Sequence, residues 1–416
     1  MRPLKIALLS RWYWEENRRN DNAEGGSLRQ LAEAVAALGH EVVVLSQSPD
    51  IKKLQKSQIG ALETWLTPRE KRRDFFTGLR DKLAKKKYNH RKIYSDALDL
   101  REFLDRRGPF DVIWAHAESP DGLVAAIAGQ LGVRLPPVLL QIQALRYRFE
   151  KGAPVFTEQL PLALAFRQAT RILANSEMVI QSLGHYTCPG FLEEDIRIRV
   201  RVVHPNLQRS FLRAAQGGMN APEPMSDRVL FLGALNPGKG ALAFLRAIPK
   251  TEVAKRSSSF VVIGNFTENN KRFIRRWEET KEETRVQTLG ARIEYLGKVS
   301  AYEVIRQILL ARVVVIPSLF DAFSRALVEA LILGRPVITT DRVGAAPLVQ
   351  THQCGIVVPP NDPDALARAI DAVLSPIVPF AENAARIAPR LIEEFSPEVI
   401  AQQIAYHLDR IAFPDS

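Results

Sequence analysis

The sequence predicts an α/β protein with two doubly wound, Rossmann-like domains that face each other across a cleft. The chain has 416 residues, which is too long for one ordinary domain. Short apolar runs alternate with helical stretches in both halves, as in parallel sheets whose strands are connected by helices. The runs of the second half are continuously apolar, as expected for strands that helices cover on both faces.

The first half opens with a strand, a helix and a second strand. Residues 4–10 form the first apolar run, and a loop with two glycines follows at 23–27. The stretch 28–38 repeats apolar residues at helical spacing, and Gly39 marks its end before a strand at 40–46. After a basic segment, further strands are predicted at 111–119, 137–143, 171–176 and 201–205.

The second half repeats this alternation after a linker at 214–227, which is rich in glycine, proline and small residues. We therefore expect a first domain at 1–213 and a second at 228–395. The last helix, 396–416, can stay with the second domain or cross back to the first. The predicted strands of the second domain are 228–235, 259–266, 293–299, 312–318, 336–341 and 355–360.

The composition is that of a folded chain without a membrane span, with 46% hydrophobic and 25% charged residues. No apolar run approaches the ~18–20 residues that cross a bilayer. The N-terminal run is interrupted at Arg11 and is too short for a secretory signal. Cys188 and Cys354 form neither a disulfide framework nor a metal-binding spacing. We therefore expect a cytoplasmic protein that needs no metal and no other cofactor.

The positive charge is concentrated in one segment. The chain carries a formal net charge of +11, and residues 51–108 hold 17 basic and 8 acidic residues, a net charge of +9. Such a basic excursion can serve nucleic acid, anionic lipid or an acidic substrate. It has no zinc pattern, aromatic RNA-binding signature or basic zipper, so a nucleic-acid partner is not expected. One helix is predicted within it by the stripe Ile93, Ala97, Leu100 and Leu104.

The stretch 318–340 carries two carboxylates on either side of a predicted helix start near Ser324. The free N–H groups and positive dipole end of such a helix suit a phosphate. Asp321 precedes the helix and Glu329 lies inside it, and a carboxylate can accept two hydrogen bonds from a vicinal diol. A phosphate between two diols describes a nucleotide sugar. The other reading is an acidic residue that complements the helix dipole.

Two glycine-containing loops are further candidate anion sites. In the loop 233–240, Gly238 and Gly240 permit a tight turn from which Lys239 can reach a phosphate. In the loop 24–27, Gly25 and Gly26 let a ligand approach the backbone. Each loop on its own also fits an ordinary turn.

Together these motifs resemble the retaining glycosyltransferases of family 4, which have the two-domain B-type fold. The stretches "PSLFDAFSRALVEALILGRPVITTD" and "GIVVPPNDPDALARAI" are similar to that family's block with two acidic residues and the segment after it. "FLGALNPGKG" resembles its glycine- and lysine-containing loop, and "EGGSLRQLAEAVAALGHEVVVLS" resembles its N-terminal run. The likeness covers most of the chain apart from about 50–108.

The sequence departs from the family pattern at several positions. Asp321 stands where the family has the first of two glutamates, and Ser324 where it has a glycine. Ala234 replaces an arginine that helps to hold the diphosphate, and Gln143 aligns with a frequent histidine. Arg325, next to the helix start, can replace the missing guanidinium.

The resemblance implies a retaining glycosyltransferase that moves a sugar from a nucleotide-sugar donor to a hydroxyl of a glycan or lipid-linked acceptor, as in polysaccharide biosynthesis. Lys239 and the helix N-terminus would neutralise the leaving diphosphate, and Asp321 would position the donor sugar. Glu329 would bind the ribose, and His116 is carried over as a catalytic residue. The remaining expected donor contacts are Gly25, Gly26, Phe323, Ser324 and Arg325.

Two alternatives remain open at this point. Ala234 and Gln143 favour a catalytically silent B-type partner protein, whereas the retained Lys239 and Glu329 oppose it. The other alternative is a different nucleotide-sugar enzyme on the same fold, such as an epimerase or a sugar-phosphate synthase.

We predict that residues 71–92 bind the inner face of an anionic membrane, where they would present a lipid-linked acceptor. The segment combines apolar side chains with a cationic rim, and each charge near the surface contributes about 1 kcal/mol. Sedimentation with liposomes should increase with anionic lipid and decrease with salt. It should also fall when Lys85, Lys86 and Lys87 become glutamine. Equal sedimentation with neutral and anionic liposomes would instead favour a solvated helical excursion.

Overall fold

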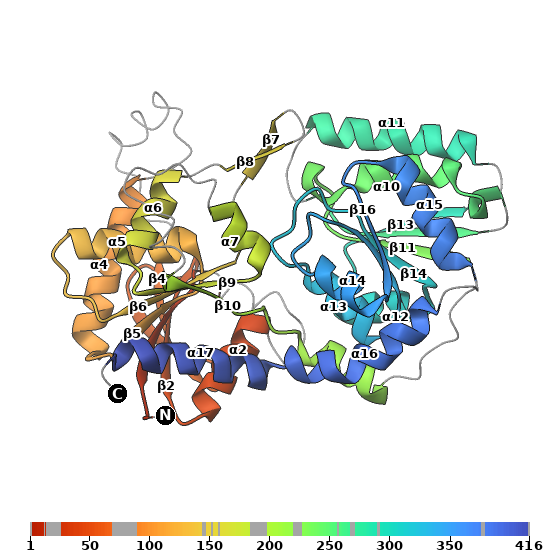
Figure 1. Cartoon of the computed structure of the whole chain (residues 1–416). Helices are drawn as coiled ribbons and strands as arrows, with labels where there is room; N and C mark the ends of the chain where they lie inside the picture. Colours follow the sequence, from red (N-terminus) through yellow and green to blue (C-terminus); the bar gives the residue numbers. More distant parts are fainter. Residues whose placement is uncertain are drawn as a thin grey trace. The chain divides into compact units, whose positions relative to one another are not determined.

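The computed structural model places the chain in two compact units. It describes residues 2–11, 13, 26–68, 90–143, 147–150, 153–156, 159–183, 198–218, 227–255, 258–266, 271–288, 292–375 and 379–414. Unit 1 consists of Met1–Glu150, Val155–His204 and Pro397–Ser416, and unit 2 of Lys151–Pro154 and Pro205–Ser396. Each unit contains a mainly parallel sheet with helices between its strands (Figure 1). This confirms the predicted α/β class with two Rossmann-like domains.

The two units meet in sequence at His204 and Pro205, before the predicted end of the first domain at residue 213. The reason is that the short helix α9 (Arg209–Arg213) packs on unit 2, where Leu207 and Phe211 are buried in the core. Of the predicted linker, residues 219–226 lie outside the described part of the chain.

The C-terminal helix α17 (Pro397–Ala412) belongs to unit 1. It lies beside α2 (Ser27–Ala37), and its residues Ile400, Ile404 and Leu408 are fully buried in the same core as the first strand (Figure 1). The C-terminal helix α17 therefore contributes to the hydrophobic core of unit 1.

Unit 1 is built on an eight-stranded sheet in the order β10-β9-β6-β5-β1-β2-β4-β3. All neighbouring strands are parallel except β3 and β4. The chain runs from β1 outward to one side and then crosses to the other side at β5, so the strand order reverses between β1 and β5. The strands are β1 (Lys5–Leu9), β2 (Glu41–Ser48), β3 (Gln55–Ile59), β4 (Leu62–Pro68), β5 (Val112–Ala115), β6 (Val138–Ile142), β9 (Arg171–Ala174) and β10 (Val200–Val202).

The helices of unit 1 cover this sheet with apolar faces. Leu28, Leu31 and Val35 of α2 are buried, as their spacing predicts, and Gly39 follows the helix with a positive φ of 96°. A separate hairpin is formed by β7 (Tyr147–Glu150) and β8 (Ala153–Phe156). The other helices are α4 (His90–Arg107), η1 (Glu118–Gly122), α5 (Leu123–Gln130), α6 (Gln159–Gln168) and α7 (Glu177–Leu183).

The predicted basic excursion is partly a piece of the sheet, which the sequence analysis missed. β4 pairs in parallel with β2, and β3 closes the edge as an antiparallel strand. Polar residues such as Lys56 of the edge strand β3 and Glu63 of its neighbour β4 obscured these strands, because neither strand has the continuous apolar run of a central one. Ala97 and Leu100 of the predicted stripe are buried on α4. Of the segment 71–92, residues 71–89 lie outside the described residues.

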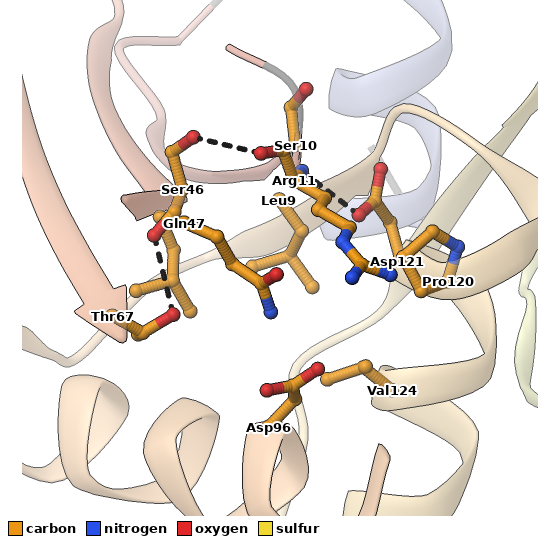
Figure 2. A pocket seen from close by; sticks show the side chains of 11 residues that line it. Leu9, Ser10, Arg11, Ser46, Gln47, Thr67, Asp96, Pro120, Asp121 and Val124 are labelled. Carbon is orange, nitrogen blue, oxygen red and sulfur yellow. Dashed lines mark hydrogen bonds between the residues drawn. The ribbon is translucent and has the colours of Figure 1, made fainter. Parts of the chain in front are cut away.

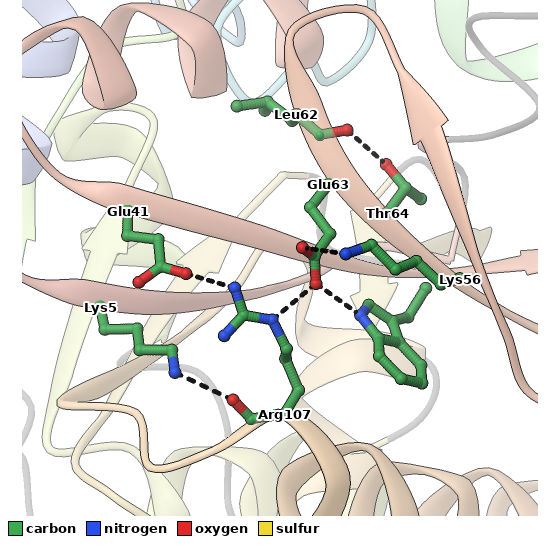
Figure 3. Close-up of polar contacts among 8 residues, drawn as sticks. Lys5, Glu41, Lys56, Leu62, Glu63, Thr64 and Arg107 are labelled. Carbon is green, nitrogen blue, oxygen red and sulfur yellow. Dashed lines mark hydrogen bonds and ion pairs between the residues drawn. The ribbon is translucent and has the colours of Figure 1, made fainter.

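A cluster of charged residues, Glu41, Lys56, Glu63 and Arg107, connects the end of α4 to strands β2 and β4 (Figure 3). Arg107 donates to Glu41 and to Glu63, the latter at 2.6 Å, while Lys56 lies 2.7 Å from the other oxygen of Glu63. Trp65 Nε1 also donates to Glu63 at 2.9 Å. Burial would raise the pKa of Glu63, but the hydrogen bonds from Arg107, Lys56 and Trp65 outweigh it and lower the pKa to about 2.

Unit 2 is built on a six-stranded, fully parallel sheet in the order β13-β12-β11-β14-β15-β16. Every residue of β11, β14 and β15 is buried, which confirms strands covered on both faces. The strand order reverses between β11 and β14. The strands are β11 (Arg228–Leu232), β12 (Ser259–Ile263), β13 (Arg292–Gly297), β14 (Val313–Ile316), β15 (Val337–Thr340) and β16 (Gly355–Val358).

The longer helices of unit 2 separate these strands in the predicted alternation (Figure 1). They are α10 (Ala241–Ala247), α11 (Lys271–Gln287), α12 (Ala301–Leu310), α13 (Arg325–Ile332), α14 (Ala346–His352), α15 (Pro363–Leu374) and α16 (Phe380–Glu394). Short helical turns follow α9 at η2 (Ala214–Gly218) and occur at η3 (Pro237–Lys239), η4 (Ile248–Lys250) and η5 (Val253–Lys255). Within the described ranges, no helix combines the length and the apolar character needed to cross a bilayer.

We predict that Glu63→Gln lowers the free energy of unfolding by about 1–2 kcal/mol at pH 7, because it breaks the Arg107 and Lys56 pairs. The folded pKa of about 2 lies below the unfolded value of 4.5, so this stabilisation is present above pH 4.5. It is lost as the pH falls toward 2. Urea denaturation as a function of pH measures it. The control Glu102→Gln removes an exposed pair with Arg106 and should change stability by less than about 0.5 kcal/mol.

Candidate functional site

The candidate site of unit 2 lies at the reversal of strand order between β11 and β14. Doubly wound sheets bind ligands outside the carboxyl ends of their strands at such a point. The loop 233–240 follows β11, and the segment 317–325 follows β14. Both stretches were predicted from the sequence as anion sites, and the sheet order brings them side by side.

Gly240 allows these two stretches to touch. It has a positive φ of 72°, and a Cβ atom at this position would lie 1.8 Å from the carbonyl oxygen of Pro317. The backbone N–H of Leu319 donates to the carbonyl of Gly238 at 2.8 Å. Asn236 shapes the turn by accepting a hydrogen bond from Gly238 N at 3.0 Å. Only glycine fits at position 240, so the approach of the loops is fixed by the sequence.

This approach brings Lys239 and Asp321 into direct contact. Lys239 Nζ lies 2.5 Å from Asp321 Oδ2, and the two side chains are 28% and 17% exposed. The backbone of Asp321 is held on its other side, because its N–H donates to Arg342 O and its carbonyl accepts from Gly344 N. The two residues predicted to handle the diphosphate and the donor sugar thus form one partly exposed ion pair.

Helix α13 begins beside this pair, at the residue predicted from the sequence. Ser324 caps it with φ 73° and ψ 86° and makes no side-chain capping bond. The left-handed φ explains why a glycine is expected at this position in the resembling family. The start of a helix carries the positive end of the helix dipole, which suits an anion near Lys239.

Two of the other predicted residues around the helix start differ in exposure. Arg325 is exposed on the first turn. Phe323 is only 2% exposed, and its ring packs against Phe395 with 5.6 Å between ring centroids. The ring of Phe323 therefore belongs to the core, and the donor contact predicted at Phe323 stays a prediction.

Glu329 is partly buried on α13, between buried neighbours. Burial raises the pKa of its carboxyl to about 7, although the positive charge of Arg325 opposes the shift. Among the residues that the structure describes, no group forms a hydrogen bond with this carboxyl. The Glu329 carboxylate is therefore a desolvated hydrogen-bond acceptor one helical turn from Arg325. A carboxylate that binds a diol would have these properties in the absence of its ligand.

The predicted residue of unit 1, His116, follows directly after β5. Its Nε2 lies 3.0 Å from Nε2 of Gln143, which follows β6. The row continues along the sheet, because Asn175 Nδ2 donates to Gln143 O at 2.9 Å and His204 lies 2.8 Å from Asn175 O. Each of these residues comes after a strand, so they line the carboxyl edge of the sheet. From the sequence, Gln143 was noted only as a departure from the family pattern, and its contact with His116 was not predicted.

The glycine pair of unit 1 is only partly described. Gly26 is buried and caps α2 in an extended conformation with φ −74°, whereas Gly25 lies outside the described residues. Gly26 stays a predicted donor contact. Cys354 is buried, and burial raises the pKa of its thiol to about 11, so it is not a reactive nucleophile.

Comparison with known proteins agrees with this arrangement. Residues 25–189 match the family described as "Glycosyl transferase 4-like domain", and residues 226–376 match "Glycosyl transferases group 1". Together the two matches cover more than half of the chain. The fold and the site define a two-domain glycosyltransferase of the B type. Within that class, the chain belongs to the family 4 glycosyltransferases.

Individual proteins are similar over nearly the whole chain. Glycogen synthase of Mycobacterium tuberculosis is 23% identical over 397 residues, which are 92% of this chain and 89% of that protein. Sucrose-phosphate synthase of Thermosynechococcus elongatus is 19% identical with a TM-score of 0.70, and covers 99% of this chain and 100% of its own. Anabaena HepE, solved with UDP and glucose, is 17% identical with a TM-score of 0.65, over 98% and 99% of the chains.

We predict that Glu329→Gln stabilises the protein at pH 8 by up to about 3 kcal/mol, because the ionised, desolvated carboxylate costs free energy. The folded pKa of about 7 exceeds the unfolded 4.5, so the cost grows as the pH rises from 4.5 through 7. Melting temperatures at pH 5 and pH 8 measure the difference. Glu393→Gln, an exposed control on α16, should show no such dependence. Equal melting of the Glu329 variant and the wild type at pH 8 would contradict a desolvated carboxyl.

Proposed function

We propose that the protein transfers a hexose from a nucleotide-sugar donor to an acceptor hydroxyl, with retention at the anomeric carbon and without a metal ion. The ion pair of Lys239 with Asp321 at the start of α13 is the observation that carries this proposal. The complex of HepE with UDP and glucose supports a uridine nucleotide as the first donor to test.

The leaving group would be a nucleoside diphosphate whose negative charge grows as the bond to the sugar breaks. Lys239 and the positive N-terminal end of α13 would neutralise this charge, and such preorganised electrostatic stabilisation is commonly the largest catalytic contribution. Arg325, exposed on the first turn, would supply the guanidinium that Ala234 does not provide.

The carboxylates would hold the two ends of the donor. Asp321 already accepts a hydrogen bond from Lys239, and its position beside the helix start suits hydroxyls of the sugar. Glu329 would accept two hydrogen bonds from the ribose diol, and the ligand would then supply the donors that this carboxyl lacks among the described residues. His116 of unit 1, oriented by Gln143, is proposed to act on the sugar as a catalytic residue.

The acceptor is proposed to be a glycan or a lipid-linked precursor of a polysaccharide, handled in the cytoplasm. Residues 71–92 would bring it from an anionic membrane surface. The similarity to sucrose-phosphate synthase supports a second candidate, in which the acceptor is a sugar phosphate. Incubation with UDP-, GDP-, ADP- and dTDP-sugars, scored by nucleotide release with and without a membrane extract or sugar phosphates, separates the two. Nucleotide binding without any release would instead support a catalytically silent partner protein.

We predict that one nucleoside diphosphate raises the melting temperature and that Lys239→Ala weakens its binding by about 10- to 150-fold. The reason is that a hydrogen bond to a charged group contributes about 1.5–3 kcal/mol. A ligand at ~100 times its dissociation constant adds ~2.7 kcal/mol to the native state. Thermal melts with UDP, GDP and ADP measure the effect.

The matched control is Lys255→Ala, since Lys255 is also an ion-paired lysine of unit 2, with Glu252 at 2.6 Å. It should leave nucleotide binding unchanged. If no nucleotide shifts the melting temperature at millimolar concentration, the donor site proposed here is not at this pair.

A further inference from the structure

Unit 1 contains a small polar pocket at its own reversal of strand order. Leu9, Ser10 and Arg11 at the end of β1 form one wall, and Pro120 and Asp121 after β5 form another (Figure 2). The pocket has a volume of about 40 Å³. A buried water needs about 10–15 Å³, so the space holds roughly three water molecules or two to three hydroxyl groups. The remaining lining comes from Leu45, Ser46, Gln47, Thr67, Asp96 and Val124.

Among the side-chain atoms that line the pocket, Ser10 Oγ, Gln47 Oε1 and Asp96 Oδ2 are buried and form no hydrogen bond within the part of the chain that the structure describes. The side chains are deeply buried, since Ser10, Gln47 and Asp96 are 1%, 8% and 6% exposed. Leaving such a group unsatisfied is unfavourable, and each of these atoms can accept a hydrogen bond. The pocket therefore suits a ligand that donates hydrogen bonds.

The charges around the pocket are mixed. Burial raises the pKa of the Asp96 carboxyl, against a hydrogen bond from Gln47 and the charges of Lys92 and Arg11, which lower it. Arg11 N donates to Asp121 Oδ1 at 3.1 Å, and Figure 2 shows the Arg11 guanidinium beside Asp121 and Pro120. The carboxylates of Asp96 and Asp121 and the guanidinium of Arg11 offset one another, so the lining favours neither a cation nor an anion, and the guanidinium can donate to an uncharged oxygen.

We propose that this pocket binds adjacent hydroxyl groups of an uncharged polyol, at the edge of a sugar ring. A hydroxyl group can donate to Asp96, Gln47 or Ser10 and can accept from Arg11. It therefore matches both the acceptors and the donors that line the pocket. The position at the reversal between β1 and β5 is where a ligand of a doubly wound domain is expected. The assignment of this polyol as the acceptor rests on the proposed glycosyltransferase function, whereas the polyol site itself does not.

Saturation-transfer NMR on the full chain tests the site, with methyl α-D-glucopyranoside, methyl α-D-mannopyranoside and myo-inositol as probes. At least one should bind with a dissociation constant in the millimolar range, about 1–10 mM. Asp96→Asn keeps the shape but replaces an acceptor by a donor, so it should weaken binding about tenfold or more. Ser10→Ala should weaken it by a smaller factor.

The matched control is Asp105→Asn, the same chemical change at an exposed position of α4. It should leave polyol binding unchanged, and thermal melts show whether each variant is folded. Equal binding by folded Asp96→Asn and wild-type protein would overturn the proposal. Absence of saturation by any probe up to about 100 mM would also overturn it and show a pocket for water only.

A fourth probe and a second assay separate the remaining readings. Tighter binding of methyl 2-amino-2-deoxy-α-D-glucopyranoside than of its hydroxyl counterpart would overturn the uncharged class of ligand. Thermal melts with UDP, GDP and ADP on the same samples report on nucleotide binding. Polyol binding without any response to these nucleotides would overturn the proposed function and keep the polyol site. A nucleotide response without polyol binding would overturn only the polyol site.

Discussion

The close approach of two loops at Gly240 is the constraint on which the site of unit 2 depends. A side chain at this position would collide with the carbonyl of Pro317, so the turn after β11 could not rest on the end of β14. Lys239 lies in the turn after β11, and Asp321 lies in the segment after β14. Their 2.5 Å contact therefore depends on the close approach of the turn and the segment. The N-cap of α13, Ser324, lies three residues beyond Asp321, so the positive end of the helix dipole is part of the same arrangement.

The sequence was sufficient to predict this arrangement because each part of it has a local signal. Gly238 and Gly240 mark the turn, Ser324 marks the helix start, and continuous apolar runs mark the central strands. The sequence was insufficient for β3 and β4, because the edge strand β3 and its neighbour β4 carry charged residues such as Lys56 and Glu63 in place of a continuous apolar run. It also gave no signal that the ring of Phe323 packs against Phe395, because that contact joins segments far apart in the sequence.

Unit 1 shows the same topology with weaker local signals. His116 was recognised at the end of its strand, but its contact with Gln143 joins two strands that are neighbours only in the sheet. The polar pocket was missed for a similar reason. Asp96 and Asp99 lie beside the apolar stripe of α4, yet they are only 6% and 8% exposed, and Asp96 lines the pocket together with Ser46, Gln47 and Thr67 of β2 and β4. In the sequence, the pocket was indicated only by two acidic residues next to the apolar face of a predicted helix.

Three carboxylates of this protein differ in how far the surrounding protein supplies their hydrogen-bond donors. Glu63 is surrounded by Arg107, Lys56 and Trp65, which lower its pKa to about 2, so its charge stabilises the fold. Burial instead raises the pKa of Glu329 and of Asp96, and each has acceptor capacity that the described protein does not use. A fold selected for stability alone would neutralise or expose such groups. Two such carboxylates lie near the two reversals of strand order. Their presence there is explained if hydroxyl groups of a ligand donate hydrogen bonds to them.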